Sequence, residues 1–137
     1  MPHFTKLTPN LLVAHVERSL AFYIDVLGFT RGLTVPDQSP FVFASVTGGP
    51  VEIFFNDRAA AAKDNPALAG GPIGGRQNSL FIEVEGIDAL HDRVKPRVTI
   101  VMPIVTQWYG MREFAIEDPD GYMIIFAERV EQNNAQT

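Results

Sequence analysis

The side chains that could carry out chemistry in this sequence are few and form no familiar catalytic set. Cysteine is absent, which excludes disulfides and thiolate metal sites. There is no G-x-S-x-G nucleophile motif or phosphate-binding glycine loop, and no spacing of Ser, His and Asp singles out a triad. Glu52, Glu83 and Glu113 could act as bases, although lone glutamates are more often structural or solvated. We therefore expect no catalytic residue.

An aromatic segment offers a different chemistry, the stacking of a ligand. Trp108, the only tryptophan, is followed by Tyr109 and Gly110 in a predicted loop, and we expect both aromatic residues to contact a ligand. Aromatic faces beside acidic groups suit flat or cationic molecules through stacking and cation–π attraction. Other aromatic residues could extend such a surface or belong to the core: Phe41, Phe43, Phe54 and Phe81.

Charge narrows the kind of ligand. The chain has 16 acidic and 11 basic residues, a formal net charge of −5, which disfavours nucleic acid as a partner. Mild acidity serves solubility and is also compatible with a cationic ligand. Arg112 could hold a ligand carboxylate, or it could pair with Glu113 or Glu117 for structural reasons.

Hydrophobic periodicity predicts the elements of the first half. Residues 6–13 read as a strand with Pro9 near its start, and Val16, Leu20, Tyr23 and Leu27 mark a helix that Gly28 ends. Three strands follow at 29–33, 41–46 and 51–55, separated by turn-forming sequences.

The middle of the chain reads as a connection. RAAAAK favours a short helix, and NPALAGGPIGG, with two Pro and four Gly, ends it. We expect a mobile linker over about residues 57–78, and such a loop could also cover a pocket.

The second half repeats the pattern of the first. A strand at 79–84, a helix at 87–94 ended by Pro96, and strands at 98–105, 112–117 and 122–128 are predicted, with DPDG at 118–121 as the last turn. The polar tail at 131–137 is expected to fray. At an offset of 71 residues Val13 matches Val84 and Val51 matches Tyr122, which indicates an internal repeat within one domain, residues 1–137. Module one covers about 4–56 and module two about 79–130.

Alternation along the strands separates a helix-covered face from an uncovered one. Because each half has one helix, the second face of its sheet must close on the other half, on a partner chain or around a ligand. The side chains on the uncovered faces mix polar and apolar types, as a pocket does. They are Thr8, Asn10, Leu12, Glu52, Phe54, Ser79, Phe81, Glu83, Met123 and Ile125.

Two strings resemble a known superfamily. VAHVERSLAFYIDVLGF (13–29) and WYGMREFAIEDPDGYMIIFAE (108–128) resemble the first helix and the closing hairpin of the vicinal oxygen chelate group, which comprises glyoxalases, bleomycin-resistance proteins and extradiol dioxygenases. The resemblance implies an α+β fold in which two βαβββ modules form a curved mixed sheet around a pocket, commonly in a dimer. His15 stands where the family usually has Asp at the start of the helix, and its imidazole is a poorer N-cap.

The resemblance also suggests where a metal would lie. Metal-dependent members take one His or Glu ligand from each of four strands, and the matching positions here are Thr8, Glu52, Ser79 and Ile125. Only Glu52 is a strong ligand, whereas a catalytic ion usually needs about three protein donors. The three histidines, His3, His15 and His91, fall outside the predicted pocket faces. We therefore expect no metal and no other cofactor.

The sequence thus predicts a metal-independent protein that sequesters a cationic or aromatic small molecule in a pocket of a homodimer, like the bleomycin-resistance members. The alternative is a glyoxalase-like lyase or dioxygenase with an atypical or absent metal site. No signal peptide and no run of about 18 apolar residues is present, so we expect a cytoplasmic protein. The expected ligand-binding residues are Thr8, Asn10, Glu52, Phe54, Ser79, Phe81, Trp108, Tyr109 and Arg112.

Overall fold

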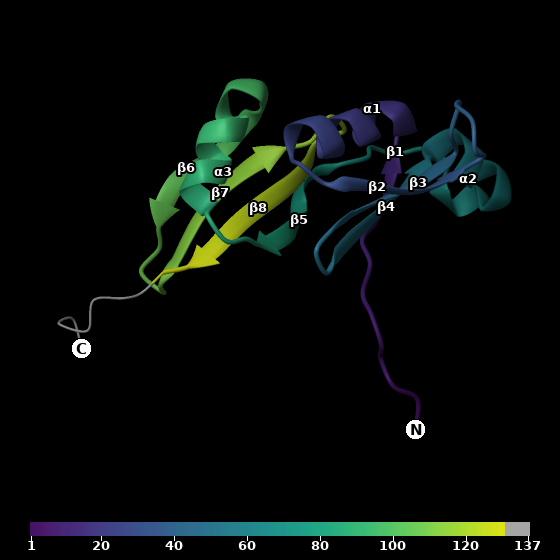
Figure 1. Ribbon diagram of the computed structural model, residues 1–137. Coiled ribbons are helices and arrows are strands. Elements are labelled where there is room, and N and C mark those ends of the chain that lie inside the picture. Colours follow the sequence, from purple (N-terminus) through teal and green to yellow (C-terminus); the bar gives the residue numbers. More distant parts are fainter. Residues whose placement is uncertain (131–137) are drawn as a thin grey trace. The chain divides into compact units, whose positions relative to one another are not determined.

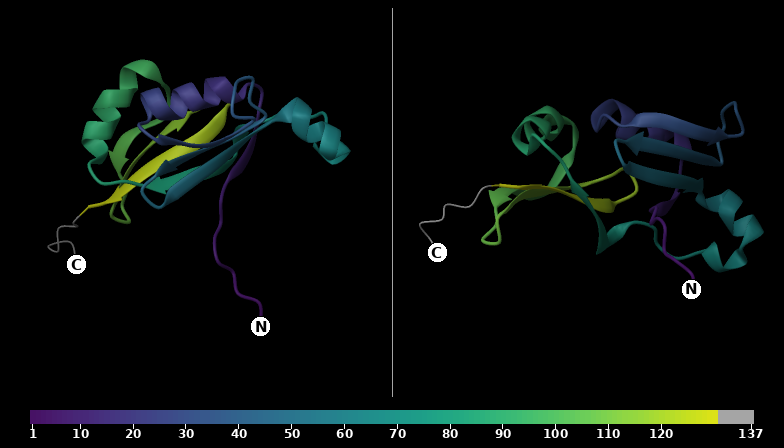
Figure 2. Two further views of the ribbon diagram at one scale, coloured as in Figure 1. Left: turned by 45° about the vertical axis from the view of Figure 1, so that its right-hand side comes forward. Right: turned by 60° about the horizontal axis from the view of Figure 1, so that its bottom comes forward.

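The computed structural model describes residues 1–130, and the chain divides into two compact units at Ile73 and Gly74. Each unit holds a four-stranded mixed sheet with a helix on one face, as Figures 1 and 2 show for α1 and α3. The α+β class and the two βαβββ modules are confirmed. The tail predicted to fray, 131–137, lies outside the described residues. In the described part of the chain, no helix is long and apolar enough to cross a membrane.

The first unit follows the predicted order of elements. They are β1 (Asn10–Val13), α1 (Val16–Ala21), a π-helical turn η1 (Phe22–Val26), β2 (Thr30–Val35), β3 (Phe43–Gly48), β4 (Val51–Asp57), α2 (Arg58–Asp64) and a 3-10 turn η2 (Pro66–Leu68). The sheet order is β1-β4-β3-β2, with β1 parallel to β4 and the other pairs antiparallel.

Local chemistry explains where the first elements begin and end. The strand predicted from residue 6 begins at Asn10; before it, the carbonyl of Pro9 accepts a hydrogen bond of 2.9 Å from the Phe54 N–H. The predicted helix is present, but it continues from Ala21 as a π-helical turn before Gly28, at φ 91°, ends it.

Periodicity placed the core of the first unit correctly. Val16, Leu20 and Tyr23 are buried on one side of the helix, against the face of the sheet that holds Val13 and Phe55. The rings of Tyr23 and Phe55 lie 4.8 Å apart. Burying such large apolar side chains is the main favourable contribution to folding.

The connection after β4 is partly ordered. The short helix predicted from RAAAAK is α2, and the Asp57 carboxylate caps it by accepting a hydrogen bond of 2.9 Å from the Ala60 N–H. Arg58 donates to the carbonyl oxygens of Gly70 and Gly71 and so fastens the glycine-rich segment. β5 begins at Gly75, so its first four residues lie in the stretch predicted as linker.

The second unit repeats the topology of the first. It contains β5 (Gly75–Glu83), α3 (Ile87–Val94), a 3-10 turn η3 (Lys95–Arg97), β6 (Thr99–Thr106), β7 (Met111–Glu117) and β8 (Tyr122–Arg129), in the sheet order β5-β8-β7-β6. Asn10 pairs with Phe54 in the first sheet, and Phe81 pairs with Ile125 in the second. Both members of the pair are shifted by the predicted 71 residues, which confirms the repeat.

The DPDG turn forms as predicted and supports the start of β5. Asp118 Oδ1 accepts from the N–H groups of Asp120 and Tyr122, each at 2.9 Å, and Gly121 has φ 86°. The backbone of Gly74 passes so close to this turn that a Cβ at this position would lie 2.1 Å from the Asp120 carbonyl oxygen. Only glycine fits this approach without movement of the backbone.

Candidate functional site

One face of the second sheet is free of the helix of its own unit. The Phe114 ring packs against His91 of α3 at 5.0 Å, so the even-numbered residues of β7 face α3 and the odd-numbered residues point away. Strand register extends this assignment to β5 and β8. We call the face away from α3 the second open face; its residues include Ser79, Phe81, Glu83, Glu113, Ala115, Glu117, Met123, Ile125 and Ala127.

This face carries the mixed character predicted for a pocket. Register places Glu83, Ala127 and Glu113 in one row across the strands, and Phe81, Ile125 and Ala115 in the next. Phe81 is 53% exposed, which is unusual for a phenylalanine within a strand. Small, aromatic and acidic side chains thus alternate here, as in sites that bind small organic molecules.

A tight hairpin between β6 and β7 presents the two aromatic residues predicted to contact a ligand. Gln107 N–H donates to the Met111 carbonyl at 2.7 Å, which leaves a three-residue loop, and Gly110 within it has φ 89°. Three-residue hairpin loops with a left-handed last residue are a favoured type. Trp108 and Tyr109 therefore occupy the hairpin tip, and Trp108 is 89% exposed.

Tyr109 is tied to the second open face through Glu113. Its hydroxyl donates to both carboxylate oxygens, at 3.0 Å each, and Glu113 is only 5% exposed. Desolvation raises the pKa of Tyr109, and the hydrogen bond to Glu113 and its negative charge raise it further. The hydroxyl therefore keeps its proton at neutral pH, and it remains the donor of the hydrogen bond to Glu113.

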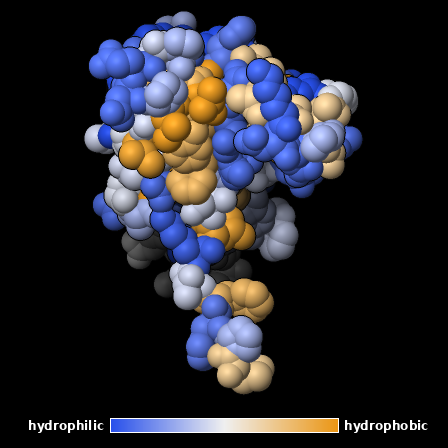
Figure 3. Space-filling view, turned by 90° about the vertical axis from the view of Figure 1, so that its right-hand side faces the viewer, coloured by the Kyte–Doolittle hydropathy of each residue, from blue (hydrophilic) through white to orange (hydrophobic). Residues whose placement is uncertain are grey.

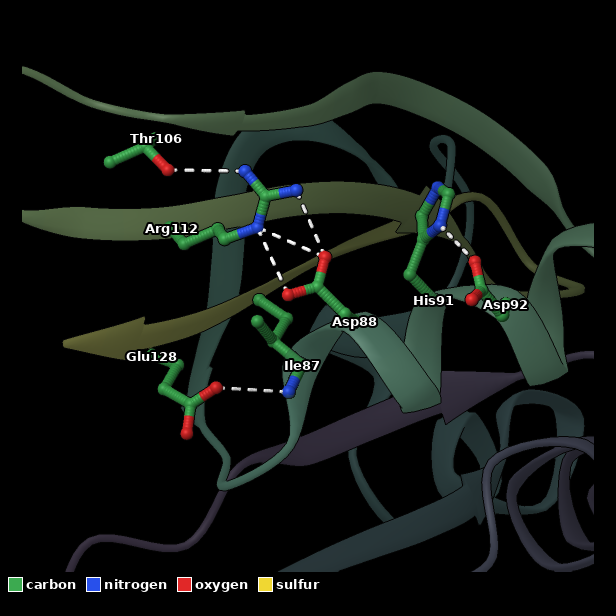
Figure 4. A network of polar contacts seen from close by, with 7 residues as sticks. All are labelled: Ile87, Asp88, His91, Asp92, Thr106, Arg112 and Glu128. Atoms are coloured by element: carbon green, nitrogen blue, oxygen red, sulfur yellow. Dashed lines mark hydrogen bonds and ion pairs between the residues drawn. The ribbon is translucent and has the colours of Figure 1, made fainter. Parts of the chain in front are cut away.

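Arg112 lies on the opposite, α3-facing side of the sheet (Figure 4). Its guanidinium donates to Asp88 Oδ1 at 2.9 Å and to Thr106 Oγ1 at 3.1 Å. Of the alternatives considered for Arg112, pairing with Glu113 or Glu117 does not occur, because residues an odd number of positions apart in a strand point to opposite faces. Glu117 instead accepts from Arg76 at 2.7 Å.

The first sheet has a corresponding open face, which carries three more of the predicted ligand-binding residues. Asn10, Glu52 and Phe54 lie on the side away from the Tyr23–Phe55 core. Each already contacts a neighbour: Asn10 accepts from Asn56, Glu52 pairs with Lys6 at 2.5 Å, and Phe54 packs edge-on against Phe43 at 5.2 Å. Thr8 is half-buried and precedes β1.

Exposed apolar side chains also occur in the first unit. Figure 3 shows apolar atoms gathered among hydrophilic ones on one side of the molecule. The large exposed apolar residues of this unit are Met1, Phe4, Leu7, Leu33, Val35 and Val42. Isolated exposed apolar residues are ordinary, so these residues indicate no site by themselves.

The donor set does not fit a catalytic metal. Of the four positions that correspond to the family's ligands, Ile125 has no donor atom, Thr8 and Ser79 offer only hydroxyls, and Glu52 is paired with Lys6. Across residues 1–130, no three His, Asp or Glu side chains come together in a group that could hold an ion. We therefore assign no step of the chemistry to a metal.

Sequence reasoning missed how Glu113 is used. It treated the residue as a lone glutamate, whereas the hairpin brings it under the Tyr109 hydroxyl. The sequence W-Y-G before an alternating strand could have indicated this contact. A three-residue loop that ends in a left-handed glycine fixes the register of the hairpin, and the register decides the face to which Glu113 points.

Comparison with known proteins places the chain in a family. The profile of the Glyoxalase/Bleomycin resistance protein/Dioxygenase superfamily matches residues 1–126. A bleomycin resistance protein of Geobacillus stearothermophilus is 32% identical over 130 residues, covering 89% of this chain and 95% of the relative. The bleomycin resistance protein of Staphylococcus aureus strain MRSA252 gives the same values.

Solved structures share the fold. A glyoxalase/bleomycin resistance protein/dioxygenase from Nocardioides superposes with a TM-score of 0.77 at 22% identity, over 97% of this chain and 88% of the other. A bleomycin-binding protein from Streptomyces verticillus, solved with copper(II)-bleomycin, gives a TM-score of 0.61 at 24% identity, over 96% and 100%. With its profile match, its relatives and its duplicated topology, this chain belongs to the Glyoxalase/Bleomycin resistance protein/Dioxygenase superfamily.

Proposed function

We propose that this protein binds and sequesters a cationic or aromatic small molecule, without chemical conversion and without a metal cofactor, as a homodimer. The observation that carries the proposal is the 32% identity to bleomycin resistance proteins over 89% of the chain. Only Glu52 among the four metal-ligand positions offers a strong donor, which favours a binder over a metal-dependent lyase or dioxygenase.

Two surfaces, one in each unit, are the candidates for contact with a ligand. One is the hairpin tip with Trp108 and Tyr109 together with Phe81 and Ser79 of the second open face. Exposed aromatic rings next to carboxylates give stacking and cation–π attraction to flat or cationic ligands.

The other surface is the first open face. Its predicted residues are Asn10, Glu52 and Phe54, with Thr8 just before β1. We leave Arg112 out of the binding surface because Asp88 and Thr106 hold it on the α3-facing side.

Titration with bleomycin, both metal-free and loaded with copper(II), tests this function. Because Trp108 is the only tryptophan and is 89% exposed, its fluorescence reports directly on the hairpin tip. We expect saturable quenching with a defined stoichiometry, and mass spectrometry should recover the drug unchanged. Expression of the chain in a sensitive bacterium should protect it from the drug.

Metal analysis separates the binder from an enzyme of the same family. The protein, purified without chelator, should hold no stoichiometric divalent ion, and dialysis against EDTA should leave drug binding unchanged. A chemically altered drug, or binding that EDTA abolishes and a divalent ion restores, would contradict the proposal.

A further inference from the structure

The two aromatic rings at the hairpin tip pack edge to face. The rings of Trp108 and Tyr109 stand at 88° to one another, with their centroids 5.3 Å apart. Trp108 is 89% exposed and Tyr109 is 41% exposed. We call this pair the aromatic corner. The rings already contact one another edge to face, so a ligand would lie against their exposed surfaces and not between them.

Glu113 gives this corner a fixed negative charge. The carboxylate is almost buried, and the Tyr109 hydroxyl is hydrogen-bonded to both of its oxygens at 3.0 Å. In the described chain, residues 1–130, no cationic side chain pairs with it. Its neighbours in the row across the strands, Ala127 and Val105, are apolar. Buried charges are usually paired, so a carboxylate in this setting favours the approach of a cation.

The hydrogen bond joins the two features. By donating to a carboxylate, the Tyr109 hydroxyl gains electron density, which strengthens the attraction of its ring for a cation. The same bond fixes the ring beside Trp108. An anionic ligand would be repelled, because the hydroxyl already donates to Glu113 and the nearest charge is negative.

We infer that the aromatic corner, backed by Glu113, is a binding site for an organic ammonium group, preferably methylated and weakly hydrated. A metal ion does not suit the site, because one carboxylate that already accepts a hydrogen bond is a poor ligand set. This inference names the cationic group of the ligand and in that respect rests on the proposed function. Recognition of methylated ammonium by aromatic rings is a known use of cation–π attraction.

The direct test compares two molecules of the same shape. Choline carries a trimethylammonium group, and 3,3-dimethylbutan-1-ol replaces it by a neutral tert-butyl group. We expect choline to bind about 2- to 30-fold more tightly, followed by Trp108 fluorescence and by calorimetry at constant ionic strength. Equal affinity for the two molecules, or no saturable binding of choline, would overturn the inference.

Variants identify the group responsible for this preference. Glu113→Gln should lower choline affinity about 2- to 30-fold and leave the neutral alcohol unaffected. Tyr109→Phe keeps the aromatic ring but loses the hydrogen bond to Glu113. It should lower choline affinity, but by less than Glu113→Gln does. Glu117→Gln removes the same formal charge from the same face of β7, where it pairs with Arg76, and serves as the matched control.

Equal losses in the Glu113 and Glu117 variants would show that the effect is one of general charge and would refute the site. Near-ultraviolet circular dichroism checks that each variant folds. If Glu113→Gln fails to fold, the comparison between Tyr109→Phe and the wild type still decides, because an unchanged choline preference in Tyr109→Phe refutes the site.

The bleomycin titration keeps the two proposals apart. If the wild type binds the drug and Glu113→Gln binds it equally well, the sequestering function stands and the ammonium site fails. If the wild type prefers choline to the neutral alcohol but does not bind the drug, the ammonium site stands and the drug-binding function fails.

Discussion

At the scale of single residues, the glutamates of the second unit have different structural roles because different groups surround them. Glu128 accepts from the N–H groups of Gly86 and Ile87, each at 3.0 Å, whereas Glu117 pairs with Arg76. Glu113 has only the Tyr109 hydroxyl as side-chain partner within residues 1–130. Residue type alone therefore does not define a site; the strand face and the nearest donor do.

Glycine provides a test at the same scale. Gly74 and Gly71 both have φ 74°, but a Cβ at Gly74 would lie 2.1 Å from the Asp120 carbonyl oxygen, whereas at Gly71 nothing lies within 4 Å. Gly71→Ala should destabilise the fold by about 1–2 kcal/mol at most, the penalty of a left-handed L-residue. Gly74→Ala should cost more, because the DPDG turn must shift as well. Urea unfolding of both variants measures the difference, and equal losses would count against the close approach.

The sequence predicted well which face of a sheet each strand residue occupies, and it predicted poorly which side chains pair with one another. Alternation correctly placed Asn10 with Leu12 and Phe54 with Glu52 on the side away from the first core. It did not find the partner of Arg112, since Asp88 is 24 residues away and lies in α3. Such contacts depend on how a helix lies on its sheet, which local patterning does not specify.

At the scale of elements, α3 begins in an unusual way. Its N-cap, Gly86, has φ 79° and no side chain, so Glu128 from β8 accepts hydrogen bonds from the N–H groups of Gly86 and Ile87 in place of a capping Ser or Asp. Figure 4 shows the bond from Ile87. These backbone hydrogen bonds lower the pKa of Glu128 below its ordinary value of 4.5. The carboxylate of Glu128 on β8 thereby caps α3, the helix that covers the sheet to which β8 belongs.

The pH dependence of stability follows from this cap. Because the folded-state pKa of Glu128 is below that of the unfolded chain, its contribution is complete above about pH 4.5 and is lost as the pH falls through the folded-state pKa. Glu128→Gln keeps an acceptor oxygen but no charge. Urea unfolding should show the wild type more stable than Glu128→Gln near about pH 7, with a smaller difference near about pH 3. A gap that does not change with pH would contradict the assignment.

Element ends were harder to predict than element types. Periodicity gave the helix over 87–94 with the bounds that α3 has, because Ile87 and Val94 are both buried. The first strand is shorter than expected, since β1 begins only at Asn10. The candidate site was predicted in part: Trp108 and Tyr109 follow from turn chemistry, whereas the contact with Glu113 requires the register of the hairpin.

At the scale of the whole molecule, the repeat is close but not perfect. The offset of 71 relates Phe55 to Phe126, yet their partners Ala44 and Phe114 differ by 70. The second hairpin loop is therefore one residue longer, at the DPDG turn that supports Gly74. The duplicated topology was readable from the sequence because hydrophobic patterning recurs, whereas this local insertion was not.

The oligomeric state is the remaining property of the whole chain that can be measured directly. Each unit has one helix on one face of its sheet, and the described surface carries large exposed apolar residues such as Leu33, Phe81 and Trp108. Exposed apolar groups on open sheets favour burial against a second copy. At micromolar concentration, sedimentation equilibrium should therefore give twice the chain mass of 15.1 kDa. The midpoint of thermal unfolding should rise with protein concentration, because dissociation accompanies unfolding. A single 15.1 kDa species with a midpoint independent of concentration would contradict the proposed homodimer.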